Sequence, residues 1–197
     1  MAKLRLSPPS LRSACAVAQV IYDIITSRNA CKIKDFDRFG EIYKKFCLSV
    51  VDLFMIRKFS ASDTDAIMNI WFESNITVHS FVPEKYWREN YAYVKQSIPE
   101  AEVYVYTDDK SNEIIAFIGL TDNYIDGLFV KENSRSKGLG KALLDYVKSI
   151  KSELTLEVYE KNAQAIEFYK REGFYVQRHS IDEDTNEKEY IMIWRKI

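Results

Sequence analysis

The chain has 197 residues, 47% of them hydrophobic and 29% charged, and its formal net charge at pH 7 is −1. These values are ordinary for a globular protein, and the near-neutral charge gives no support to nucleic-acid or membrane-surface binding. No apolar run reaches the roughly 20 residues that a membrane-spanning helix needs. With only two histidines, and three cysteines that follow no metal-type spacing, no metal site is predicted.

The first 54 residues differ in composition from the rest. They carry nine Lys/Arg and five Asp/Glu, whereas residues 55–197 carry nineteen and twenty-four. They also hold all three cysteines, and this odd number without a secretion signal predicts reduced thiols and a cytoplasmic protein. Their early cations and serines resemble a targeting segment. We expect residues 1–54 to be a helical or disordered extension, dispensable or preceding a natural start at Met55.

Residues 55–197 are predicted to form one mixed α/β domain. Periodicity predicts, in order, a strand, two helices, three strands, a helix, a strand, a helix and two strands. The predicted strands are 55–60, 102–107, 113–121, 123–130, 153–159, 174–180 and 189–196. The predicted helices begin near 60–62, 83, 139 and 162.

The segment from Arg135 to Lys141 joins a predicted strand to a predicted helix. Its glycines, Gly138 and Gly140, let backbone N–H groups approach an anion, and the helix N-terminus adds positive potential. Arg135, Lys137 and Lys141 supply charge. The pattern favours a phosphate site, although a tight turn with surface cations would look the same.

Two common phosphate motifs do not fit this segment. A Walker loop needs Ser or Thr after the lysine, and here Ala142 follows Lys141; a dinucleotide fingerprint needs three glycines after the first strand. Arg135-x-x-Gly138-x-Gly140 instead resembles the acetyl-CoA pyrophosphate motif of the GCN5-related N-acetyltransferase (GNAT) family. The segment LEVYEKNAQAIEFYKREGF resembles that family's next signature at Asn162, Ala165, Tyr169, Gly173 and Phe174. The resemblance extends from Met55 to the C-terminus.

The resemblance implies a mostly antiparallel sheet with flanking helices, and acetyl-CoA as acetyl donor without a metal. In that family the loop grips the pyrophosphate and the pantetheine arm follows the preceding strand. The cofactor-binding residues expected from it are Leu128, Phe129, Val130, Arg135, Ser136, Lys137, Gly138, Leu139, Gly140, Lys141 and Asn162.

Two residues are predicted to be catalytic. The Tyr169 phenol, with an ordinary pKa of about 10, can protonate a thiolate leaving group, and it falls at the motif position. Alternation places Glu157 on the polar face of its strand, where protein-acetylating relatives carry a base. Asp126 is the rival base. Tyr169 could instead be part of a helix's core stripe, and Glu157 could be a solvated or structurally paired carboxylate.

The segment HSFVPEKYW (79–87) favours small bacterial enzymes that acetylate protein lysines as the nearest relatives. Aromatic side chains suit the stem of a lysine, which makes Tyr124, His79, Phe81 and Tyr86 the expected acceptor-site residues. Each could equally be structural. The predicted acceptor is a primary amine, a protein lysine or N-terminus; a small-molecule amine and a non-catalytic acyl-CoA sensor remain alternatives. We expect a monomer or homodimer with no nucleic-acid partner.

Overall fold

The computed structural model describes residues 55–196, so the predicted extension 1–54 lies outside the described residues. The order of strands and α-helices is the predicted one. The strands are β1 (Ile56–Lys58), β2 (Glu102–Thr107), β3 (Ile114–Thr121), β4 (Tyr124–Val130), β5 (Glu153–Tyr159), β6 (Tyr175–Ile181) and β7 (Lys188–Arg195). The α-helices are α3 (Thr64–Val78), α4 (Glu84–Ser97), α5 (Leu139–Ile150) and α6 (Ala163–Arg171). Short 3-10 turns occupy Ala61–Asp63, Ile98–Glu100 and Glu132–Ser134.

The seven strands form one sheet in the order β1-β2-β3-β4-β5-β7-β6. Neighbouring strands are antiparallel except β4 and β5, which run parallel and pair only at Tyr124 and Thr155. Beyond that point β4 pairs with β3 alone, so its other edge makes no strand pairing within residues 55–196. The prediction of a mixed α/β fold with a mostly antiparallel sheet is confirmed.

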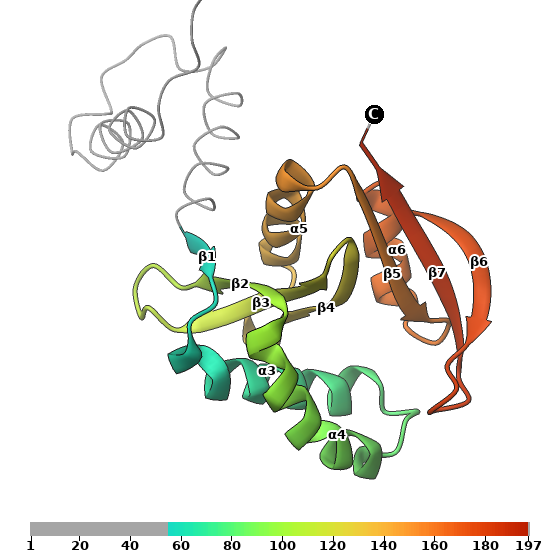
Figure 1. The fold of residues 1–197 in the computed structure, drawn as a ribbon, viewed down its shortest axis with the longest axis horizontal. Helices are drawn as coiled ribbons and strands as arrows, with labels where there is room; N and C mark the ends of the chain where they lie inside the picture. Colours follow the sequence, from blue (N-terminus) through green and yellow to red (C-terminus); the bar gives the residue numbers. More distant parts are fainter. Residues whose placement is uncertain (1–54, 197) are drawn as a thin grey trace, which may run out of the picture. The chain divides into compact units, whose positions relative to one another are not determined.

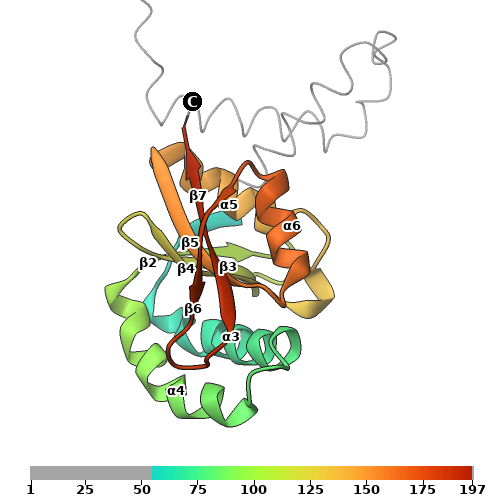
Figure 2. The same ribbon diagram turned by 90° about the vertical axis from the view of Figure 1, so that its right-hand side faces the viewer.

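Helices cover both faces of the sheet (Figures 1 and 2). On one face α3 and α4 pack on β2 and β3 through a buried cluster centred on Ile67, Trp71 and Val105. On the other face α5 and α6 pack on a cluster that includes Leu143, Leu156 and Tyr169. Apolar side chains recur at helical spacing along α5, which explains why this helix lies flat on the sheet. Within the described residues, no helix has the length and apolarity to cross a membrane.

Candidate active site

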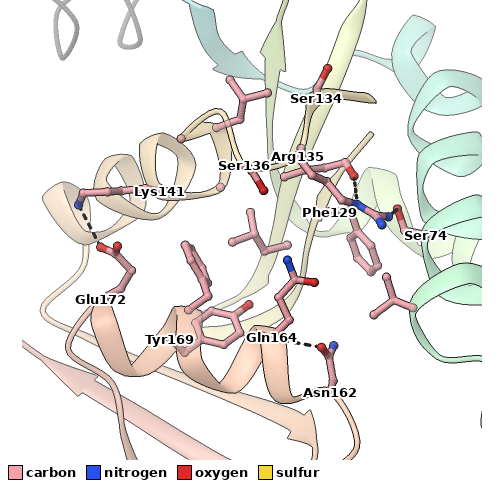
Figure 3. Close-up of a pocket in the computed structure, with 18 of the residues that line it drawn as sticks. Ser74, Phe129, Ser134, Arg135, Ser136, Lys141, Asn162, Gln164, Tyr169 and Glu172 are labelled. Atoms are coloured by element: carbon pink, nitrogen blue, oxygen red, sulfur yellow. Dashed lines mark hydrogen bonds and ion pairs between the residues drawn. The ribbon is translucent and has the colours of Figure 1, made fainter. Parts of the chain in front are cut away.

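A cleft of about 540 Å³ opens where β4 and β5 part. Its walls come from β4, the loop that precedes α5, the cleft-facing side of α6, and the C-terminal end of α3 (Figure 3). Ten of the eleven predicted cofactor-binding residues line it: Leu128, Phe129, Val130, Arg135, Ser136, Gly138, Leu139, Gly140, Lys141 and Asn162. The eleventh, Lys137, does not line it, and its Nζ donates to the Asn133 carbonyl at 2.7 Å.

The loop before α5 is shaped by two residues in the left-handed region. Ser136 has φ 60° and Gly138 has φ 87°, and Gly138 forms the N-cap of α5. A Cβ added to Gly138 would meet nothing within 4 Å, so glycine is favoured there by backbone conformation rather than by crowding. Left-handed residues beside a helix N-terminus turn successive N–H groups toward one side, which makes a concave anion site.

The three cations on the cleft differ in how far the protein already engages them. Arg135 donates from Nε to the Val130 carbonyl at 3.2 Å and from Nη2 to Ser74 Oγ at 3.4 Å. Lys141 binds the carboxylate of Asp145 at 2.9 Å. It also binds the carboxylate of Glu172 at 3.0 Å (Figure 3). The Arg171 side chain forms no hydrogen bond or ion pair with any residue in 55–196. It is therefore the cation most available to an anionic ligand.

Tyr169 belongs to the core and also lines the cleft (Figure 3). Its ring packs edge-on against Phe168 and Phe174, with centroid distances of 5.2 and 5.4 Å. Its hydroxyl has no hydrogen-bond partner among the described residues. Burial raises the pKa of Tyr169 above its ordinary value, which keeps the phenol protonated at neutral pH. The geometry thus provides a proton donor on the cleft with a free O–H.

Glu157 lies outside the cleft, next to the point where the strands part. The Tyr124 hydroxyl donates to the Glu157 carboxylate at 2.9 Å, and burial together with that carboxylate raises the pKa of Tyr124. The rival base, Asp126, accepts from Thr121 Oγ1 at 2.9 Å, and burial raises its pKa. A β-bulge leaves Asp126 without a partner on β3, because Gly127 pairs with Gly119 and Ile125 with Leu120.

The other predicted acceptor residues form an aromatic cluster after α3. His79 contacts Phe81 at a centroid distance of 5.6 Å and Tyr159 at 5.2 Å, and Tyr86 contacts Trp87 at 5.0 Å. Tyr159 donates to Asp182 in the turn between β6 and β7 at 2.5 Å. Of the predicted acceptor residues, His79 alone lines the cleft; Phe81, Tyr86 and Tyr124 do not.

Sequence reasoning did not assign several cleft residues. Ser74 and Val78 come from α3, and Gln164, Phe168, Arg171 and Glu172 come from α6 and its end. The sequence could have predicted the α6 residues, because positions 164, 165, 168, 171 and 172 share a helix face next to Tyr169. No local pattern marks Ser74 or Val78 as cleft residues, because α3 lies about sixty residues before the Arg135 loop in sequence.

Comparisons with known proteins point to one family. The acetyltransferase (GNAT) domain family matches residues 99–176. Peptidyl-lysine N-acetyltransferase YiaC of Escherichia coli (strain K12) is 32% identical over 142 residues, which are 71% of this chain and 96% of YiaC.

Two solved structures have similar folds. The solution structure of apo-form YjaB from Escherichia coli has a TM-score of 0.64 at 28% identity, over 71% of this chain and 95% of that one. The paia N-acetyltransferase from Thermoplasma acidophilum, solved with coenzyme A, has a TM-score of 0.58 at 23% identity, over 72% and 98% of the two chains. The chain therefore belongs to the GNAT family of acetyl-CoA-dependent N-acetyltransferases.

Proposed function

We propose that this protein transfers the acetyl group of acetyl-CoA to the ε-amine of a protein lysine. The observation that carries the proposal is that Tyr169, whose hydroxyl is unengaged among the described residues, lines the same cleft as the anion-binding loop before α5. A donor for the leaving thiolate and a site for the pyrophosphate are thus parts of one cavity. The name of YiaC supports a lysine as the acceptor.

The charged side chains and backbone groups of the cleft support acetyl-CoA as its ligand. The ligand carries about four negative charges, and the loop offers N–H groups beside Arg135, with Arg171 nearby. The edge of β4 that does not pair with β5 offers backbone groups to the pantetheine amides at Leu128 to Val130. An amide that pairs there would extend the sheet, as an added strand does.

The transfer needs a base, oxyanion donors and an acid. Glu157 takes a proton from the lysine ammonium, directly or through one water, and the neutral amine attacks the thioester carbonyl carbon. Backbone N–H groups of β4 stabilise the oxyanion that forms, a contribution of about 10²–10³ in rate. The C–S bond then breaks, and Tyr169 protonates the departing thiolate. The attacking nitrogen loses its second proton to solvent as the amide forms, Glu157 passes its own proton to solvent, and solvent returns one proton to the phenol, so that one proton is released in net.

The Tyr124–Glu157 hydrogen bond supports Glu157 as the base. Tyr124 stands at the single position where β4 pairs with β5, and its hydroxyl holds the Glu157 carboxylate there. This O–H occupies one lone pair of the carboxylate and leaves the others able to accept a proton. The face of β5 that carries Glu157 also carries Tyr159. The Tyr159 ring contacts Phe81 and so belongs to the aromatic cluster. Aromatic rings can contact the aliphatic stem of an incoming lysine.

The test is direct. The full chain is incubated with acetyl-CoA and panels of lysine peptides, N-terminal peptides and small amines, while free thiol is measured and products are weighed by mass spectrometry. We expect thiol release that depends on lysine peptides. The mass of each modified peptide should rise by that of one acetyl group in place of one hydrogen. Release with small amines alone would indicate a small-molecule enzyme. Binding of acetyl-CoA without release would indicate a sensor.

A further inference from the structure

A line of hydrogen bonds connects the end of α3 to the start of α6 beside the cleft. Asn75 Nδ2 donates to the Trp71 carbonyl at 2.9 Å, and Asn75 Oδ1 lies 3.0 Å from His79 Nδ1. His79 Nε2 lies 3.1 Å from Asn162 Nδ2, and Asn162 Oδ1 accepts from the Ala165 N–H at 3.2 Å. Residues more than eighty positions apart are thereby joined through one imidazole.

The two ends of this line fix the role of every atom in it. The Trp71 carbonyl can only accept, so Asn75 presents its oxygen to the imidazole, and His79 Nδ1 must carry the proton. The Ala165 N–H can only donate, so Asn162 presents its NH₂ group, and His79 Nε2 must be the acceptor. The imidazole is therefore neutral and in a single tautomer.

The surroundings of His79 favour that neutral state. Its ring is flanked by Phe81, Trp87 and Tyr159, at centroid distances of 5.6, 5.7 and 5.2 Å. Tyr159 is the titratable group among these rings, and it uses its hydroxyl on Asp182. Burial lowers the pKa of His79 to about 4. The acceptor at Nε2 therefore persists through the neutral pH range.

Asn162 has one amide N–H that this arrangement leaves available. Its oxygen caps α6 and one N–H bonds His79, while the residue itself lines the cleft together with His79. Without His79 the side chain would keep its cap but lose the contact that fixes the direction of its NH₂ group. The same end of α3 also holds Arg135 through Ser74, at the loop before α5.

We propose that His79 is a positioning residue of the acetyl-CoA site: it fixes the Asn162 amide so that its second N–H faces the bound cofactor. The inference rests on the proposed function, because it assumes that acetyl-CoA occupies the cleft. It moves His79 from the acceptor side, where its sequence context placed it, to the cofactor side.

The test uses two substitutions that keep opposite halves of the imidazole. His79→Gln keeps an acceptor oxygen near the position of Nε2, whereas His79→Asn keeps a polar group near Nδ1 and is too short to reach Asn162. A neutral hydrogen bond of ordinary strength corresponds to about 2- to 12-fold in affinity. By calorimetry on the full chain, we expect His79→Asn to weaken acetyl-CoA binding within that range and His79→Gln to restore most of it.

A double variant separates positioning from general structural damage. In an Asn162→Ala background, His79→Asn should weaken binding no further, because the group that His79 positions is gone. His179→Asn, at the exposed second histidine, controls for loss of an imidazole and should bind like wild type. If His79→Asn does not fold, His79→Phe gives the same comparison while keeping the ring contacts.

The outcomes are distinct. Equal affinities for wild type and His79→Asn, or an equal further loss in the Asn162→Ala background, would overturn the inference. Failure of the wild-type chain to bind acetyl-CoA would instead overturn the proposed function on which it rests.

Discussion

The Tyr124 hydroxyl donates a 2.9 Å hydrogen bond to the Glu157 carboxylate next to the single pairing of β4 with β5, that of Tyr124 with Thr155. This contact brings a carboxylate from the second half of the sheet to the mouth of the gap between the strands. The cofactor cleft lies at that gap. The separation of the parallel strands β4 and β5 therefore positions both the proposed base and the proposed cofactor site.

Glu157→Gln is expected to lower kcat by about 10²–10⁴, the usual contribution of a general base. The amide keeps the size of the carboxylate and can still accept from Tyr124, so the KM for acetyl-CoA should change little. Asp126→Asn is the matched control, since Asp126 is the rival base and also a carboxylate close to Tyr124. Steady-state kinetics on both variants show which carboxylate is the base. A near-normal kcat in Glu157→Gln together with a large loss in Asp126→Asn would assign the base to Asp126.

Tyr169→Phe is expected to lower kcat by about 10²–10⁴ while leaving acetyl-CoA affinity nearly unchanged. The phenyl ring preserves the contacts with Phe168 and Phe174, and no described residue loses a hydrogen bond. The melting temperature should therefore stay close to that of wild type. A purely structural tyrosine would leave kcat unaltered, and that result would remove Tyr169 from the mechanism.

The sequence was sufficient to predict the order of the elements, because that order depends on local periodicity. The roles assigned to the loop before α5 and to Tyr169 rest on short motifs and stay predictions. The sequence could not show that Ser74 reaches Arg135, because that contact depends on how α3 packs across the sheet. The bulge at Asp126 was also missed, since strict alternation assumes an unbroken register. The sequence also could not show that Glu172 lies 3.0 Å from Lys141, because that contact joins α5 to the residue that follows α6.

Substitutions at Gly138 should separate backbone strain from charge. Gly138→Ala places a Cβ in open space but in the left-handed region, which costs about 1–2 kcal/mol of stability. Gly138→Asp adds a similar strain and a negative charge where the pyrophosphate would lie, so it should abolish acetyl-CoA binding. Both variants are compared by thermal melting and calorimetry. Equal affinities for the folded Ala and Asp variants would remove the phosphate site from this loop.

Arg171→Gln is expected to raise the KM for acetyl-CoA by about 2- to 5-fold. One exposed ion pair contributes up to about 1 kcal/mol to the free energy of binding, which corresponds to that factor. The difference from wild type should shrink at high salt, because exposed charges are screened. Lys170→Gln is the control, as this neighbouring cation is paired with Glu167 and does not line the cleft. Identical KM values for wild type and Arg171→Gln at low salt would contradict the prediction.

His79 should also leave a signature in the dependence of stability on pH. Burial lowers its pKa from 6.5 to about 4, so between these values the unfolded chain binds a proton that the folded chain does not. The free energy of unfolding must then fall as pH drops below about 6.5, and the part due to His79 reaches about 2 kcal/mol at pH 5. His79→Phe keeps a ring in the aromatic cluster but cannot titrate. Urea unfolding of both proteins at pH 7 and pH 5 isolates this part, because the carboxylates titrate alike in the two chains. We expect the loss of stability on acidification to be smaller in the variant by that amount; the same loss in both proteins would mean that the imidazole is not held neutral in the fold.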